Sequence, residues 1–333
     1  MSTPVTEQLR ADAVPGAPPI VSVAADGAQG LLVGRRADLR AVVAEHGAVL
    51  VRGLDLRDAD DVATASRQLT TTLLTEREGF APRDIYPGGV YSGSAWPAGQ
   101  PMCMHHELSH AAQTPSLMIF GCLRAADEGG TTALADGQAV LRALPAAIVD
   151  RFEQVGWQLV RTYDNGLGVS AAAAFGSDDR DTVLAYCAAN GIDAAWDGDG
   201  RLHTRQRRSA VVPHPRTGIR GWFNQIAFLN AWTMDPDVRE YLLAEVGDDG
   251  LPFDTRYGDG EPIDEDTVRE INAVYEEHTI GEPWQSGDLL LVDNIRMAHS
   301  REPFSGDRDV VVAMGDPIVV ADNDPSVLAV QRD

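Results

Sequence analysis

Apolar and polar residues follow two different periods along this chain, one typical of helices and one typical of short strands. Residues 31–47 and 58–74 carry apolar side chains at helical spacing, and the apolar run AVLVRG stands between them. Short apolar runs such as SLMIFGCL, DLLLVDN and DVVVAMG follow, separated by turn residues, with further helical stretches near 137–155 and 264–278. The pattern predicts a β-rich α+β fold in which helices pack against sheets.

The breaks in this pattern predict the domain organisation. Residues 1–20 are rich in Ala and Pro and lack apolar periodicity, so we expect a mobile N-terminal arm. Residues 21–333 contain no internal repeat and no Pro/Ser-rich linker, which predicts a single domain. The Gly- and Pro-rich segment 83–100 and the segment 164–182 are candidate lids over a pocket.

The charge and the apolar content argue against several classes of function. Fifty acidic residues against twenty-seven basic ones give a net charge of -23, which repels nucleic-acid phosphates and anionic membranes. No apolar stretch approaches the roughly 20 residues of a membrane span, and the start lacks the apolar segment of a secretory signal. Three cysteines without CxxC spacing fit a reducing compartment. We therefore expect a cytoplasmic protein that binds a small molecule, with no nucleic acid or membrane as partner; its oligomeric state stays open.

The segment MHHELSH contains two incompatible metal-binding motifs that share Glu107. In the first, His106, Glu107 and His110 form an HExxH motif, in which histidines four residues apart bind zinc and the glutamate acts as general base. That motif works inside a helix, whereas glycine and proline residues stand close to this segment on both sides. The helical context of a zinc hydrolase is therefore poor.

In the second motif, His105 and Glu107 stand two residues apart on or beside a strand, so their side chains point to the same side. Two histidines and one carboxylate on one face of iron(II) leave three positions free, which suits a chelating oxoacid and dioxygen. His299, which follows the apolar run 289–292 and a turn, is the candidate for the third ligand.

Further motifs accompany the HxE motif in a fixed order. They are GGTT at 129–132, GWFNQ at 221–225 and DNxxxxHxRxPFxGxR from Asp293 to Arg308. With this set, the sequence resembles the TauD/TfdA family of iron(II)- and 2-oxoglutarate-dependent dioxygenases, especially its clavaminate synthase-like branch, which modifies amino acids. The resemblance extends from Gly47 to Met314.

The resemblance implies a fold, a set of cofactors and roles for named residues. The fold would be a distorted double-stranded β-helix, or jelly roll, with buttressing helices. The enzyme would use iron(II), 2-oxoglutarate as cosubstrate and dioxygen. His105, Glu107 and His299 would bind the metal, while Arg308 and Thr132 would receive the distal carboxylate of 2-oxoglutarate. A guanidinium suits that task because it offers two parallel donors to a carboxylate.

The resemblance also implies a substrate class: an amino acid or derivative, free or tethered to a carrier protein, that is hydroxylated or desaturated in specialised metabolism. Arg83, Arg161, Arg216 and Asn224 are candidates for contacts with a substrate carboxylate or amide. Two alternatives stay open. One is the zinc hydrolase, and the other is a non-catalytic sensor of small molecules on the same fold.

Overall fold

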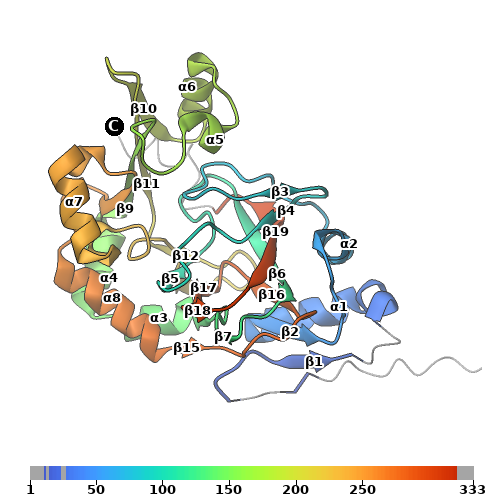
Figure 1. Ribbon diagram of the computed structural model, residues 1–333. Coiled ribbons are helices and arrows are strands. Elements are labelled where there is room, and N and C mark those ends of the chain that lie inside the picture. Colours follow the sequence, from blue (N-terminus) through green and yellow to red (C-terminus); the bar gives the residue numbers. More distant parts are fainter. Residues whose placement is uncertain (1–10, 13–14, 24–27, 321–333) are drawn as a thin grey trace, which may run out of the picture.

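Two β-sheets form the centre of the molecule (Figure 1). The computed structural model describes residues 11–12, 15–23 and 28–320. In the larger sheet β1 is parallel to β2, and the remaining neighbours are antiparallel. In sheet order its strands are β1 (Ile20–Ser22), β2 (Ala48–Arg52), β16 (Leu289–Asp293), β6 (Thr114–Arg124), β19 (Asp309–Ile318), β4 (Val90–Ser92) and β3 (Ile85–Tyr86).

The smaller sheet packs against the inner face of the larger one. Its strands, in sheet order, are β15 (Thr279–Ile280), β8 (Leu134–Asp136), β17 (Met297–Arg301) and β5 (Met102–His105). Leu134 and Met297 of this sheet share one apolar cluster with Leu50, Phe120 and Val312 of the larger sheet. This sandwich confirms the predicted β-rich jelly roll.

Helices cover the outer face of the larger sheet, as the sequence pattern predicted. They are α1 (Ala28–His46) and α2 (Ala59–Leu69), drawn in blue in Figure 1. On β2, Val49 and Val51 face these helices, whereas Ala48 and Leu50 face the smaller sheet. Both faces of the strand are buried, and this explains why it reads as an uninterrupted apolar run.

Three more helices buttress the outer face of the smaller sheet. They are α3 (Gly137–Ala143), α4 (Ala146–Val155) and α8 (Glu265–Glu277), in the regions where the sequence predicted helices. Phe152 of α4 and Ile271 of α8 share an apolar cluster with Met104, Ala135 and Ala298 of the sheet.

The segment between α4 and α8 contains more regular structure than the pattern predicted (Figure 1). Asp179 caps α6 and Asp235 caps α7, where Pro236 occupies the first turn, so the sequence does carry start signals for both helices. The strand that enters the GWFNQ motif ends at Trp222, and the Asn224 side chain then accepts a hydrogen bond from the Ile226 N–H in the turn that follows. The segment comprises β9 (Trp157–Tyr163), α5 (Ala171–Phe175), α6 (Arg180–Ala189), β10 (Ile192–Trp196), β11 (Leu202–Arg208), β12 (Val211–Pro213), β13 (Arg220–Trp222), η1 (Ala231–Thr233), α7 (Pro236–Val246), η2 (Asp248–Gly250) and β14 (Asp254–Tyr257).

The N-terminal region lies partly outside the described residues. Of the predicted arm, residues 1–10 and 13–14 are not described, whereas Pro18 and Pro19 are buried and the Leu50 N–H donates to the Pro19 carbonyl at 2.9 Å. In the described part of the chain, no helix combines the length and the apolar character needed to span a membrane.

Candidate active site

The turn that carries Glu107 is held by a distant asparagine. Strand β5 ends at His105, and a turn from Glu107 to His110 follows, with Leu108 at a φ of 51°. The Glu107 N–H donates to Asn294 Oδ1 at 2.8 Å, and Asn294 Nδ2 donates to the Glu107 carbonyl at 3.0 Å. Asn294 belongs to the DN motif at the end of β16. The motif marked this residue in the sequence, but only the structure shows its task.

Three side chains that can bind a metal come together at this turn. His299 on β17 is the antiparallel partner of His105 on β5, so the register of the two strands places the two rings side by side. Glu107 Oε2 lies 3.6 Å from His299 Nε2 and 3.9 Å from His105 Nε2. The three ligand atoms lie within 4.8 Å of one another, and all three residues are buried. Two imidazoles and one carboxylate are the donor set of a non-haem iron(II) site.

The ring of His105 is oriented by its neighbours. Its Nδ1 lies 2.9 Å from the Cys103 carbonyl, and the ring stacks on Phe228 at a centroid distance of 4.2 Å. A carbonyl can only accept, so Nδ1 carries the proton and Nε2 presents its lone pair toward Glu107 and His299. The tautomer that metal binding requires is therefore fixed by the backbone.

Burial and charge set the protonation of the site. Burial, reinforced by His299, lowers the pKa of His105 to about 3, so the imidazole is neutral near pH 7. Burial alone would raise the pKa of Glu107, but the Arg83 guanidinium and the two histidines hold it below its usual range. Both groups are therefore in the protonation state of a metal ligand.

A guanidinium with an associated threonine lies in the same pocket. Arg308 Nε donates to the Gly130 carbonyl at 2.8 Å, and its Nη2 lies 3.4 Å from Thr132 Oγ1, which also accepts from Trp284 Nε1 at 3.2 Å. Strand β18 (Phe304–Ser305) pairs with β7 (Glu128–Gly129), which brings the two motifs together. Gly130 has a φ of 74°, and a Cβ there would stand 2.9 Å from Arg308 Cδ. The GGTT motif thus makes room for the arginine.

Comparisons with known proteins agree with this geometry. The model of the family described as "Taurine catabolism dioxygenase TauD, TfdA family" matches residues 14–314. The chain belongs to this family. Membership confirms the resemblance found in the sequence, the enzyme class and its cofactors, iron(II) and 2-oxoglutarate.

Relatives of the oxygenase are found in bacteria and plants. It is 35% identical over 277 residues to the dapdiamide synthesis protein DdaC of Enterobacter agglomerans. The aligned region covers 83% of this chain and 84% of that protein. It is 27% identical over 286 residues to a clavaminate synthase-like protein of Arabidopsis thaliana, with 83% of each chain covered. The crystal structure of AAD-2 in complex with Mn(II) and N-oxalylglycine has a TM-score of 0.54 at 13% identity, and covers 95% of this chain and 99% of that one. It shares the fold.

The HExxH interpretation does not fit the structure of the oxygenase. Residues 107–110 form a turn and not a helix, so His106 and His110 do not share one helix face. His106 Nδ1 lies 2.6 Å from the Asn294 carbonyl, and His110 bonds to the Gln225 side chain and the Glu78 carbonyl. The zinc-hydrolase alternative is therefore contradicted by the local geometry.

Of the four side chains predicted to contact substrate, the structure brings only Arg83 to the pocket. Arg161 donates to the carbonyls of Glu78 and Gly79 at 2.8 and 2.9 Å, which makes it a support of that loop. Asn224 is buried and donates to the Ala210 carbonyl at 3.1 Å.

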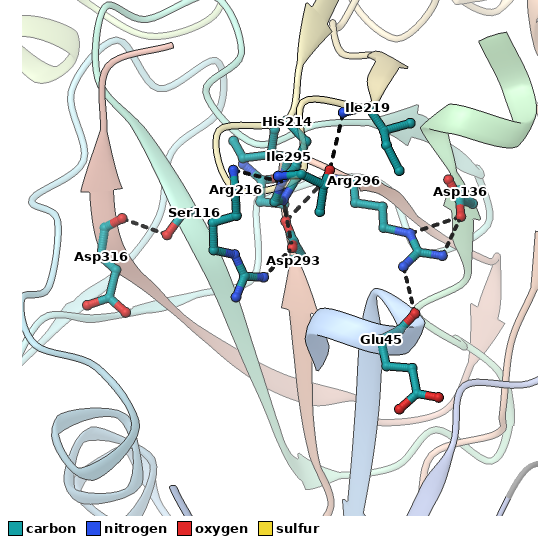
Figure 2. Close-up of polar contacts among 12 residues, drawn as sticks. Glu45, Ser116, Asp136, His214, Arg216, Ile219, Asp293, Ile295, Arg296 and Asp316 are labelled. Atoms are coloured by element: carbon teal, nitrogen blue, oxygen red, sulfur yellow. Dashed lines mark hydrogen bonds and ion pairs between the residues drawn. The ribbon is translucent and has the colours of Figure 1, made fainter. Parts of the chain in front are cut away.

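The fourth candidate, Arg216, lies in a different cluster (Figure 2). Its Nη2 lies 3.3 Å from Asp293 Oδ2, the same oxygen that lies 3.0 Å from His214 Nε2. This cluster lines a separate cavity with Arg40 and Ser116. A substrate role for Arg216 in the metal pocket does not agree with this placement.

Segment 83–100, which the sequence suggested as a lid, contributes Arg83, Gly93 and Ser94 to the pocket lining and is held in place by Arg301. Arg301 Nη1 donates to the Trp96 carbonyl at 3.1 Å, and its Nη2 donates to the carbonyls of Pro97 and Gln100 at 2.6 and 2.8 Å. Arg301 is 9% exposed and also lines the pocket. The HxR spacing after His299 marked it in the sequence, but no role for it was predicted.

Proposed function

We propose that His105, Glu107 and His299 hold iron(II), and that Arg308 with Thr132 receives the distal carboxylate of 2-oxoglutarate. The observation that carries this proposal is the buried His–Glu–His cluster in one pocket with that arginine and threonine. Bound iron would supply the activation of dioxygen, coupled to conversion of 2-oxoglutarate to succinate and carbon dioxide.

The residues of the chain perform three tasks in this scheme. The neutral His105 and the ionised Glu107 present lone pairs to the metal without first losing a proton. Arg308 orients the cosubstrate through two parallel donors, so that its oxoacid end faces the ligands. Phe120, Val310 and Val312 line the pocket with apolar surface, which limits the access of water.

For the substrate we propose an amino acid or amino-acid derivative, free or tethered to a carrier protein, that is hydroxylated or desaturated in specialised metabolism. The proposal is supported by the similarity to a protein of dapdiamide synthesis and to a clavaminate synthase-like protein. Arg83 is the candidate for a contact near the substrate, since it lines the pocket. A cytoplasmic location stays a prediction.

The test has two steps. Anaerobic addition of iron(II) and 2-oxoglutarate to the purified protein is expected to produce the charge-transfer absorption of a chelated oxoacid. Aerobic incubation with a panel of amino acids and dipeptides, followed by mass spectrometry, is expected to show one product that has gained oxygen or lost hydrogen. Absence of the absorption band contradicts the ligand assignment, and absence of succinate would favour the small-molecule sensor.

A further inference from the structure

A buried arginine contacts the carboxylate of the metal cluster. Arg83 Nη2 donates to both oxygens of Glu107, at 3.2 Å to Oε1 and 3.3 Å to Oε2. The Arg83 side chain is only 6% exposed and that of Glu107 only 3%. A charge-assisted contact between two groups removed from water is expected to restrict how the carboxylate can rotate.

The Nε side of the Arg83 guanidinium, away from Glu107, contacts a second carboxylate. Its Nε lies 3.5 Å from Oε1 of Glu76, whose backbone N–H donates to the Tyr91 hydroxyl at 2.9 Å. Burial opposes the charge on the guanidinium, but Glu107 and Glu76 more than compensate and raise the pKa of Arg83. The guanidinium is therefore a fixed cation that bridges two carboxylates.

The two oxygens of Glu107 have different surroundings. Oε2 is the oxygen that lies close to the Nε2 atoms of both His105 and His299. Arg83 Nη2 contacts both oxygens at nearly the same distance, so it is the approach of the two histidines to Oε2 that distinguishes them. A metal bound among the three ligands would take Oε2, and Arg83 would then keep Oε1.

We propose that Arg83 is a positioning residue that holds Oε1 of Glu107, so that the carboxylate binds the metal through Oε2 alone. The proposal rests on the proposed function of His105, Glu107 and His299 as ligands. A glutamate bound through one oxygen leaves three coordination positions, two for the oxoacid and one for dioxygen. A glutamate bound through both oxygens would occupy the dioxygen position, so Arg83 keeps that position open.

The test counts water on the metal and does not depend on activity. The wild-type protein is loaded with Mn(II) and 2-oxoglutarate, and the broadening of its EPR lines in oxygen-17-enriched water reports coordinated water. We expect broadening in the wild type, its loss in Arg83→Met, and its return in Arg83→Lys, because lysine restores a cationic donor to Oε1. Arg216→Met is the matched control, since Arg216 also pairs with a buried carboxylate but lies outside the pocket.

A second measurement separates positioning from a general structural role. Removing a cation from beside a divalent metal removes repulsion, so Arg83→Met is expected to bind Mn(II) at least as tightly as wild type. Its rate of 2-oxoglutarate consumption is expected to fall about 10- to 100-fold, the usual cost of losing a partner of a metal ligand. Glu76→Gln removes the charge that holds the Nε side of Arg83 but keeps Arg83 itself, so both the loss of rate and the loss of the water signal should be smaller than in Arg83→Met.

The possible outcomes separate the two proposals. Weaker Mn(II) binding in Arg83→Met with the water signal intact would assign Arg83 to folding alone and overturn the inference. An unchanged water signal at unchanged affinity would overturn it as well. If the wild-type protein forms no complex with Mn(II) and 2-oxoglutarate, the ligand assignment fails before Arg83 is tested. If Arg83→Met does not fold, the other two variants test the inference. A positioning role of Arg83 requires that Arg83→Lys retains the water signal and that Glu76→Gln weakens it.

Discussion

Substitution of Arg308 by leucine tests the cosubstrate site most directly. Truncating one partner of a buried, hydrogen-bonded charge pair costs about 2 to 5 kcal/mol. Arg308 is partly buried, and burial together with nearby Arg301 lowers its pKa to about 10. The cost of removing the guanidinium from water therefore offsets part of the attraction between Arg308 and a bound carboxylate. We therefore expect the lower half of the range, about 2 to 3 kcal/mol, which corresponds to about a 30- to 150-fold rise in KM for 2-oxoglutarate.

The assay is succinate formation at saturating iron and substrate with varied 2-oxoglutarate, combined with anaerobic calorimetry of cosubstrate binding. Arg308→Lys keeps the charge but loses the paired donors, so it should lie between wild type and Arg308→Leu. Arg124→Met is the control, since Arg124 forms an exposed ion pair with Asp307 on the same loop. If Arg308→Leu leaves KM and calorimetric affinity for 2-oxoglutarate unchanged, the arginine does not belong to the cosubstrate site.

Three further predictions concern the metal cluster and the turn beside it. His105→Ala and His299→Ala should each abolish iron binding and turnover, whereas His110→Ala should retain bound iron, because the His110 ring is hydrogen-bonded to Gln225 and to the Glu78 carbonyl. The metal content of the purified variants checks this prediction, and loss of iron in His110→Ala alone would contradict it. With Glu107 as the proposed carboxylate ligand, no equivalent coordination position is left for chloride, so the product formed in chloride-rich buffer should contain added oxygen or lack hydrogen, and a dominant chlorinated product in mass spectrometry would refute this. Burial lowers the pKa of His106 to about 4, so between pH 6.5 and 4 this imidazole is protonated more in the unfolded chain than in the folded one, and His106 alone should lower the free energy of unfolding by about 3 kcal/mol as the pH drops through that window. Urea unfolding of the metal-free protein measures the slope, which His106→Asn should reduce; an equal slope in both proteins would be inconsistent with a buried neutral imidazole.

The sequence predicted the sheets and the metal cluster because both depend on regular geometry. Short apolar runs indicated strands, and two of these strands, β2 and β16, are buried on both faces in the structure. The two-residue spacing of His105 and Glu107 indicated a position on or beside a strand, and the structure places His105 at the end of β5. The position of His299 after an apolar run and a turn made it a candidate, and the family resemblance assigned it the role of third ligand. Its approach to His105 depends on the pairing of strands far apart in the chain.

Contacts of the individual arginines could not be predicted in this way. Arg83, Arg161 and Arg216 have the same chemistry, although Arg83 and Arg216 lie in loops and Arg161 lies in strand β9. The difference lies in partners remote in sequence: the carboxylate of Glu107 for Arg83, backbone carbonyls for Arg161, and Asp293 for Arg216. The packing of the folded chain decides these partners, and the spacing of apolar and polar residues along the sequence does not reveal them.

Net charge was an incomplete guide for a related reason. The chain carries a charge of -23, yet Arg83, Arg301 and Arg308 all line the metal pocket together with the acidic side chain of Glu107. The field outside the protein depends on the summed charge and is screened within about 10 Å at moderate salt, whereas groups inside a pocket interact over a few ångströms with little screening. An acidic surface and an anion-binding pocket are therefore compatible. The bulk charge argues against phosphate-rich macromolecules as partners, but it does not argue against a dicarboxylate as cosubstrate.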